Sequence, residues 1–219
     1  MDNSKNSSSV CVAIFSARET PEILERTVAA ALRASTPVTP IDVMVNGNRA
    51  LGEHLAASFR TGASADAARV RIWYLAPGDK ANAWNQHIHH IWDGASLAFY
   101  VDGYVELDAN AISQLTHTMH AQPEALAGSG VPSVGRSSKR LRQDMLTLGG
   151  MHGNFCCIRD SALRALRQRK MLLPCISQNP GGNDRFEVIK CLVGCSLSFR
   201  IAGSPDIFMN RIAHVAVRV

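Results

Sequence analysis

Short apolar segments alternate with helical segments along the first half of the sequence, and this alternation limits the fold more than any other feature. The apolar segments have the length and composition of buried strands, and they span residues 10–16, 41–46, 70–75 and 96–107. The helical segments between them span residues 20–35, 51–59 and 79–92. Strands separated by helices predict an α/β fold, with a mainly parallel sheet flanked by helices on both faces.

The second half of the chain is less regular. We expect a helix at 108–120, capped by Asp108, and then a mobile loop at 128–147 that is rich in Gly, Ser and basic residues. A strand and a helix are expected within 151–170, and a further helix at 185–193. The chain closes with apolar runs at 196–201 and 207–219. With 219 residues, 46% of them hydrophobic, the chain has the size and apolar content of one domain. We expect a disordered tail at 1–9 and a single domain at 10–219.

Composition predicts a cytoplasmic protein. The polar start MDNSKNSSSV lacks the apolar core of a signal peptide, and no apolar run reaches the ~20 residues that span a bilayer. The six cysteines form no CxxC pair, so we expect small buried side chains in a reducing compartment and not zinc ligands. A location at the inner face of the membrane remains compatible with these features.

The charge of the chain narrows the class of partner. A formal net charge of +5 suits an anionic ligand such as a nucleoside diphosphate, and it equally suits peripheral association with an anionic membrane surface. The basic residues form no continuous stripe, and aromatic residues make up only 6% of the chain, too few for a base-stacking platform. We therefore expect no nucleic-acid partner.

Polar residues follow the predicted strands at their carboxyl ends, which is where ligands bind in parallel α/β sheets. These strand ends are Ser16–Glu19, Asn46–Asn48, Pro77–Lys80 and Asp102–Glu106. No GxGxxG follows any strand, so a dinucleotide-dependent oxidoreductase is not expected.

The order and spacing of the motifs, from about residue 10 to about residue 217, resemble family 2 of the inverting glycosyltransferases, which have the GT-A fold. The resemblance implies a nucleotide-binding half at 10–107 and an acceptor-binding half at 108–219. FSARE places Ser16 and Glu19 where the family has an acid near the nucleobase. Asn46 stands where the family has an aspartate that touches uracil or ribose, and its amide can still hydrogen-bond a base edge or a hydroxyl. GDKANAWNQ matches the family's Gly-Lys, small residue and Asn through Gly78, Lys80, Ala83 and Asn85.

FYVDGYVEL aligns with the strand that ends in Asp-x-Asp in this family, the motif that holds Mg²⁺ or Mn²⁺ against the donor diphosphate. Asp102 matches the first aspartate and Gly103 the variable position, but Tyr104 stands at the second aspartate. A neutral phenol is a poor ligand for Mg²⁺. The resemblance therefore implies Asp102 as a metal or diphosphate contact. Glu106 would share a face with Tyr104 if the strand continued, and is the candidate for a substitute metal ligand.

The acceptor half carries the remaining matches. GMHGNFCCIRDSAL resembles the family's Gly-containing strand followed by an Arg and a helix, through Gly153 and Arg159, and it brings His152 to the acceptor side. Asp184 matches the family's general base at the start of a helix. The implied reaction transfers a sugar from a nucleoside-diphosphate sugar, expected to be a UDP sugar, to the hydroxyl of a glycan or lipid-linked acceptor with inversion.

Several residues have a second interpretation. Asp102 and Asp184 could serve only as turn or helix caps. The histidines of QHIHH are expected on the exposed face of a helix: His87, His89 and His90. A basic run forms either a solvated surface or a loop that closes on the diphosphate through charge-assisted contacts: Arg136, Lys139, Arg140 and Arg142.

Two other functions share this architecture. A degenerate GT-A domain would bind a nucleotide or glycan without turnover, and both Tyr104 and Asn46 favour it. A sugar-phosphate nucleotidyltransferase would need a glycine-rich, arginine-containing loop after the first strand, where this chain has SARETPEIL without glycine.

Overall fold

The computed structural model describes residues 9–61, 65–135, 138–148, 153–173 and 217–218, and its strands form one sheet. The strands are β1 (Val10–Ser16), β2 (Ile41–Asn46), β3 (Val70–Leu75), β4 (Leu97–Asp102), β5 (Ala127–Val131), β6 (Phe155–Arg159) and β7 (Val217–Arg218). Their order across the sheet is β3-β2-β1-β4-β6-β5-β7. Neighbours from β3 to β4 run parallel, β6 is antiparallel to β4 and β5, and β5 pairs in parallel with β7. The mainly parallel sheet is therefore confirmed.

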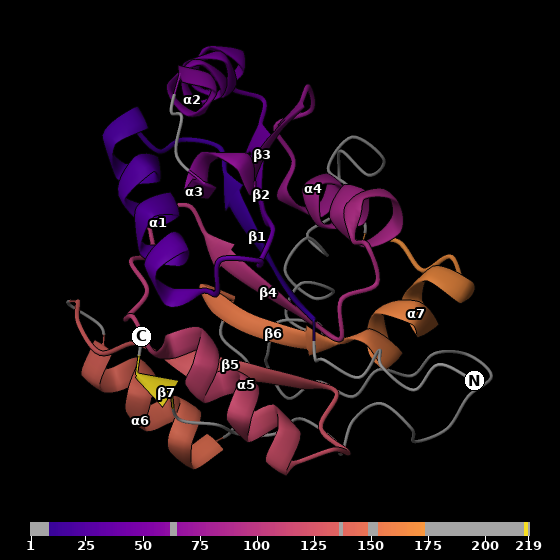
Figure 1. Ribbon diagram of the computed structural model, residues 1–219. Helices are drawn as coiled ribbons and strands as arrows, with labels where there is room; N and C mark the ends of the chain where they lie inside the picture. The colour runs from indigo at the N-terminus through magenta and orange to yellow at the C-terminus, as the bar shows by residue number, and fades with distance from the viewer. Residues whose placement is uncertain (1–8, 62–64, 136–137, 149–152, 174–216, 219) are drawn as a thin grey trace, which may run out of the picture.

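Helices cover both faces of this sheet (Figure 1). They are α1 (Pro21–Ala34), α2 (Arg49–Thr61), α3 (Ala65–Ala68), α4 (Lys80–Gln86), the π-helix η1 (His87–Ile91), α5 (Ala111–Ala121), α6 (Ser138–Leu148) and α7 (Asp160–Gln168). One face packs against α1, α2 and α5 through side chains such as Val28 and Leu115. The other packs against α4, η1 and α7 through Trp84 and Leu163. Because β1, β2 and β4 are buried on both faces, their sequences are nearly continuous apolar runs.

Helix starts follow the expected capping chemistry in one case and depart from it in another. Thr20 caps α1 by accepting a hydrogen bond from the Ile23 N–H, and Pro21 is the first helical residue, as predicted. The prediction of Asp108 as a cap is wrong: α5 begins at Ala111, with Asn110 at the N-cap. Asp108 contributes its backbone carbonyl to that turn, 2.9 Å from the Ala111 nitrogen.

The helix predicted at 79–92 forms, but its second half is a π-helix. Asp79 caps it through hydrogen bonds from the backbone N–H groups of Ala81 and Asn82. His87, the first residue of η1, is completely buried. The prediction of a solvated His87 is therefore wrong, whereas His90 is exposed as expected and His89 is half-buried.

The mobile loop predicted at 128–147 is also wrong, because this segment contains most of β5 and most of α6. One small residue of β5, Gly128, is closely packed. A Cβ atom on Gly128 would lie 3.0 Å from both Leu115 Cδ1 and Met119 Sδ, so these two α5 side chains would have to shift to admit a larger residue. The basic run of α6 consists largely of good helix formers.

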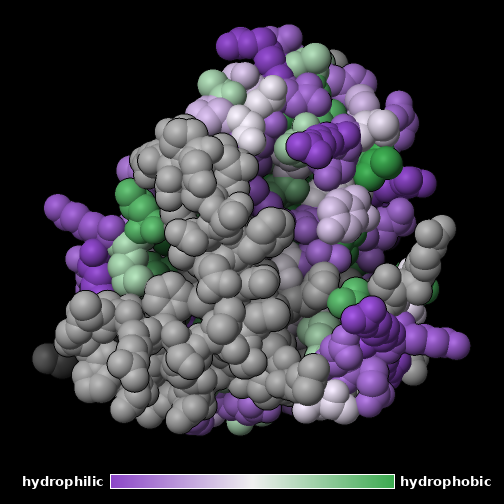
Figure 2. Space-filling model, turned by 180° about the vertical axis from the view of Figure 1, so that it is seen from behind, coloured by the Kyte–Doolittle hydropathy of each residue, from purple (hydrophilic) through white to green (hydrophobic). Residues whose placement is uncertain are grey.

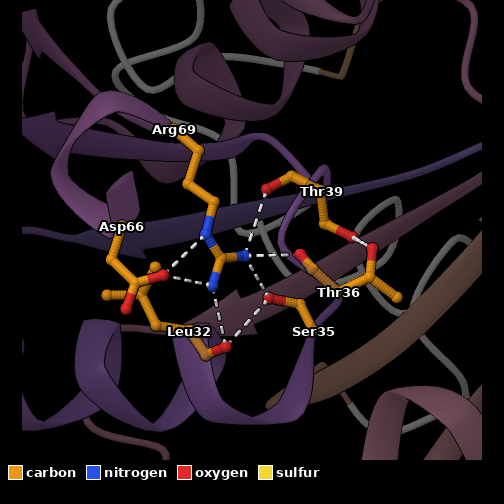
Figure 3. Close-up of polar contacts among 6 residues, drawn as sticks. All are labelled: Leu32, Ser35, Thr36, Thr39, Asp66 and Arg69. Atoms are coloured by element: carbon orange, nitrogen blue, oxygen red, sulfur yellow. Dashed lines mark hydrogen bonds and ion pairs between the residues drawn. The ribbon is translucent and has the colours of Figure 1, made fainter. Parts of the chain in front are cut away.

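Arg69 holds the turn after α1 to the start of β3 (Figure 3). Its guanidinium donates to the backbone carbonyls of Leu32, Thr36 and Thr39 at 3.0, 2.7 and 3.4 Å. It also donates to Asp66 Oδ1 at 2.8 and 3.1 Å. Carbonyls at the end of a helix lack intrahelical partners, so this side chain satisfies groups that would otherwise need water.

A buried carboxylate, Asp42, lies near the start of β2 on the face covered by α4 and η1. Arg71 binds both of its oxygens at 2.7 Å, and the indole N–H of Trp73 donates to Oδ1 at 2.7 Å. His87 Nε2 lies 3.7 Å from Oδ2. Burial alone would raise the pKa of Asp42, but these polar neighbours outweigh it and hold the pKa below its usual value. We call these four residues the Asp42 cluster.

Two further expectations concern the cysteines and the membrane. Cys11, Cys156 and Cys157 are free and buried, as predicted, while Cys175, Cys191 and Cys195 lie outside the described residues. Across the described ranges, no helix combines the length and apolar character needed to cross a bilayer.

Candidate functional site

The carboxyl ends of β1, β2 and β4 meet at one edge of the sheet. Asp102, the last residue of β4, pairs with Phe15 of β1, and Asn46 follows the β2 residue that pairs with Ser16. Lys80, the first residue of α4, forms an ion pair with Asp102. The structure therefore brings together the polar ends of β2 and β4 and the start of α4, and we call this region the carboxyl-edge site.

Gly103 allows the end of β4 to lie close against the end of β1. Its N–H donates to the Phe15 carbonyl at 2.8 Å, and its own carbonyl accepts from the Thr27 hydroxyl at 2.9 Å. A Cβ atom here would lie 2.9 Å from Ser16 Cβ, closer than two carbon atoms can pack. The middle residue of the motif is thus fixed by close packing, a requirement that the sequence alone did not reveal.

Two glycines, Gly47 and Gly78, bring the end of β2 into contact with the loop before α4. Gly47 has a φ of +66°, and a Cβ atom on it would lie 2.8 Å from Gly78 Cα. Its N–H donates to the Leu75 carbonyl at 2.7 Å. This approach places Asn46 and Lys80 at the same edge, since each is a short distance along the chain from one of the two glycines.

Both oxygens of the Asp102 carboxylate receive a donor from the protein. The Lys80 ammonium binds Oδ1, and the Tyr104 hydroxyl lies 3.1 Å from Oδ2. The same hydroxyl lies 3.0 Å from Asn154 Oδ1, so its hydrogen can be donated to either acceptor. Asp102 is only 7% exposed, whereas Lys80 and Tyr104 extend into solvent. A buried carboxylate therefore presents its two partners at the surface of the site.

Tyr104 is a neutral hydrogen-bond donor in this arrangement. Partial burial and the negative charge of Asp102 raise the pKa of the phenol to about 12. At neutral pH the group therefore keeps its proton, and it supplies neither the charge nor the pair of oxygens that a second aspartate would bring.

Glu19 is held by the loop that it belongs to. Its Oε2 accepts from the Ser16 hydroxyl at 2.6 Å and from the backbone N–H groups of Ala17 and Arg18 at 2.8 and 3.1 Å. Burial raises the pKa of Glu19, but these hydrogen bonds outweigh burial and lower it. The carboxylate is thus charged at neutral pH and fixes the turn that follows β1.

Asn46 presents an amide whose oxygen is unsatisfied. The residue is 3% exposed, and Asn46 Oδ1 has no hydrogen-bond partner among the described residues. A buried acceptor without a donor costs about 1–3 kcal/mol, so a ligand that supplies an N–H or O–H here would recover that free energy. Asn46 at the end of β2 is therefore a candidate for ligand binding.

Asn85 has a structural role that the sequence did not predict. Its amide nitrogen donates to the Leu173 carbonyl at 2.9 Å, and its oxygen accepts from the Leu173 N–H at 2.8 Å. This two-way bond ties α4 to the segment after α7, and the nucleotide contact implied by the resemblance stays a prediction.

The described residues do not fit a divalent cation. β4 ends at Asp102, so Glu106 does not continue a strand face with Tyr104, and it instead forms an exposed pair with Arg26 at 3.6 Å. Within the described part of the chain, no three His, Cys, Asp or Glu side chains are grouped to hold a metal ion. The two Asp102 oxygens, which would be the hard ligands, are bonded to Lys80 and Tyr104.

The other predicted residues fall elsewhere. Arg140 is exposed on α6, which packs against β5, and it lies 3.7 Å from Asp144. Figure 2 shows mainly hydrophilic side chains at the lower right, where the half-turn from Figure 1 brings α6. Three predicted residues lie outside the described residues: Arg136, His152 and Asp184.

Comparison with known proteins supports the fold. No protein-family model matches the sequence, and no curated protein matches it. Among solved structures, the chain is similar to the mannosyltransferase PcManGT from Pyrobaculum calidifontis, in complex with GDP-Man and Mn²⁺, with a TM-score of 0.58 and 16% identity over 75% of this chain and 47% of that one. It is also similar to S. aureus TarS 1–349, with a TM-score of 0.55 and 8% identity over 80% of this chain and 52% of that one.

The chain spans about half the length of these two structures, and the identities are low, so the likeness concerns the fold. The GT-A-like α/β architecture implied by the sequence resemblance is confirmed.

Proposed function

We propose that the protein is a glycosyltransferase that takes its sugar from a nucleoside-diphosphate sugar. The observation that carries this proposal is the carboxyl-edge site: in a glycosyltransferase-like fold, Asn46, Lys80 and Asp102 converge where parallel α/β sheets bind ligands. The net charge of +5 favours an anionic donor. The mannosyltransferase structure holds GDP-Man, so guanosine and uridine donors are both candidates.

Each residue of the site has a role in this proposal. Asn46 offers its unsatisfied amide oxygen to an N–H of the base or a hydroxyl of the ribose. Glu19 shapes the turn against which the nucleoside lies. Lys80 contacts the diphosphate, and Asp102 orients Lys80 and, through Tyr104, the sugar side of the site.

The proposed reaction is a single displacement at the anomeric carbon. The acceptor hydroxyl oxygen forms a bond to that carbon as the bond to the diphosphate oxygen breaks, and the nucleoside diphosphate leaves with the bonding electron pair. The hydroxyl proton passes to a carboxylate, and the resemblance assigns this role to Asp184. Attack from the side opposite the leaving group inverts the anomeric configuration. A glycan or a lipid-linked hydroxyl is the proposed acceptor class.

The substitution Asp184→Asn tests the reaction apart from binding. We expect transfer from a UDP or GDP sugar to fall by at least about a hundredfold, because a lost general base typically costs that much. The affinity for UDP or GDP alone, measured by calorimetry, should stay within about twofold. A variant with normal turnover would remove Asp184 from the mechanism. Loss of both turnover and nucleotide affinity would instead assign it to donor binding.

A catalytically inactive binding domain is the second candidate. The observation in its favour is that both oxygens of Asp102 are already bonded to protein donors. This candidate predicts nucleotide binding without transfer or donor hydrolysis, across a panel of UDP and GDP sugars and hydroxyl acceptors. Measurable release of nucleoside diphosphate that depends on the acceptor would exclude it.

A further inference from the structure

Asp102, Lys80 and Tyr104 form a closed polar unit at the position where the resemblance implies a metal site. Lys80 supplies a positive charge on one side of the Asp102 carboxylate, and Tyr104 supplies a neutral donor on the other. Two aspartates at this position would give two negative charges that need a cation to accept an anionic diphosphate. Here the charges of Lys80 and Asp102 cancel, so the unit carries no net negative charge that would repel a diphosphate.

The Lys80 ammonium is placed to contact a ligand as well as Asp102. Its side chain is 42% exposed, while the Asp102 side chain is 10% exposed, so the cation lies on the outer side of the pair. An ammonium has three N–H donors, and its bond to Asp102 uses one of them. Phosphate oxygens can therefore take the remaining donors without breaking the pair, and lysine commonly binds phosphate in this way as a point charge.

The position of Tyr104 also keeps the metal-free arrangement stable. Its hydroxyl bridges Asp102 and Asn154, which joins the end of β4 to the turn before β6. Because the phenol remains protonated at neutral pH, it acts on Asp102 as a donor and does not add a second anion. Glu106 offers no replacement, since it pairs with Arg26 away from this unit.

We infer that this site binds the diphosphate of its donor without a divalent cation, and that the Lys80 ammonium occupies the place of the metal. The inference rests on the proposed function, because it concerns how the same site holds a nucleoside diphosphate. It names Lys80 as the donor-binding cation and Tyr104 as the residue that makes the site independent of metal.

Calorimetric titration of the full chain with UDP and with GDP, in EDTA and in Mn²⁺, tests the inference directly. We expect UDP, GDP or both to bind, with an affinity in EDTA that is within about twofold of the affinity in Mn²⁺. Binding that disappears in EDTA and returns with Mn²⁺ would overturn the inference and leave the proposed function standing. Failure of both nucleotides to bind in either condition would overturn the proposed function, and the inference with it.

Substitutions separate the charge of Lys80 from its packing. Lys80→Met should lower the affinity in EDTA by about tenfold to a hundredfold, the range for a lost charge-assisted hydrogen bond, and Lys80→Arg should recover most of it. Arg33→Met is the matched control, since it removes one exposed positive charge in the last turn of α1, at the end of that helix farther along the chain from the β1 turn. Equal affinity in the wild type and Lys80→Met would contradict the assignment, provided that thermal melts show both chains folded.

Tyr104→Asp tests the inference by creating metal dependence. The change restores a pair of carboxylates at the end of β4 and removes the hydroxyl from Asp102. We expect nucleotide affinity to fall in EDTA and to rise by at least about tenfold on addition of Mn²⁺. Tyr104→Phe, which removes the hydroxyl without adding a carboxylate, should remain insensitive to Mn²⁺. If Mn²⁺ does not change the nucleotide affinity of Tyr104→Asp, the assignment of Tyr104 as the residue that makes the site independent of metal is contradicted.

Discussion

Asp42 and Asp102 lie on the same face of one sheet, and each is buried and paired with a basic side chain, yet their surroundings differ. Asp42, near the start of β2, is surrounded by Arg71, Trp73 and His87. Asp102, at the end of β4, is bonded to Lys80 and Tyr104, whose side chains extend into solvent. We therefore expect the same kind of ion pair to contribute to stability inside the sheet and to ligand binding at its carboxyl edge.

The difference shows how position along a strand decides what a buried carboxylate can do. At the Asp42 cluster, the carboxylate is 1% exposed on the face covered by α4 and η1, although its partners Arg71 and Trp73 are partly exposed. At the carboxyl-edge site the strands stop, and the partners of Asp102 are the last covering groups before solvent. We therefore expect a ligand at the second site, where the parallel strands end.

The largest effect on stability is expected from removing the Asp42 carboxylate. Asp42→Asn leaves Arg71 and Trp73 beside a group that cannot accept both guanidinium bonds, and we expect the free energy of unfolding to fall by about 2–4 kcal/mol. Urea denaturation of the two chains measures the change. The affinity for nucleotide should be unaffected in the fraction that remains folded, and a loss below about 0.5 kcal/mol would show that the Asp42 cluster does not stabilise the fold.

Gly103→Ala should have the next largest effect. The added Cβ would meet the backbone and Cβ of Ser16, which cannot move without separating β1 from β4. We expect a loss of about 1–3 kcal/mol in the free energy of unfolding, together with weaker nucleotide binding. Gly52→Ala is a suitable control, because its nearest new contact would be 3.7 Å away at Tyr74. Similar stability of both variants would refute the close approach.

Unlike Asp42→Asn, Asp102→Asn should have a small effect on stability and a large effect on nucleotide binding. Since Lys80 and Tyr104 can both be solvated, we expect a change of about 1 kcal/mol or less in the free energy of unfolding. The affinity for UDP or GDP should nevertheless fall by about tenfold, because Lys80 is no longer held at the edge of the sheet. A variant that loses several kcal/mol of stability but binds nucleotide normally would make Asp102 a structural residue like Asp42.

The pH dependence of stability gives the smallest expected effect. The folded-state pKa of Asp42 is lowered, so its contribution is fully present above the unfolded pKa of about 4 and is lost as the pH falls through the folded value. Denaturation between about pH 6 and about pH 2 should show a shallower acid loss for Asp42→Asn than for the wild type. If the free energy of unfolding falls equally steeply with pH in both chains, protonation of Asp42 does not contribute to acid denaturation.

Sequence patterns predicted the parallel strands because a strand buried on both faces leaves an unmistakable apolar run, as in Val10–Ser16 and Ile41–Asn46. They missed β5 because its residues AGSGV have the composition of a loop, whereas Gly128 lies in close contact with α5. The burial of His87 was also missed, since it places the imidazole beside Asp42 of β2, which is distant along the chain.

The candidate site was predicted in part. Strand ends placed Asn46, Lys80 and Asp102 at one edge, and the structure brings them together. The sequence identified Tyr104 as a departure from the metal motif, but the bond to Asp102 appears only when the chain turns at Gly103. Likewise, Asn85 matched a motif in sequence while its amide is bonded to Leu173, which is distant along the chain.

Chemical-shift mapping of backbone amides during titration with UDP or GDP tests most directly whether this edge binds nucleotide. The account predicts saturable shifts at residues 16–19, 46–48, 78–80 and 102–104, with the amides of Asp42 and Arg71 almost unchanged as an internal control. No saturable shift with either nucleotide, or shifts centred on the Asp42 cluster and not on the carboxyl edge, would contradict it.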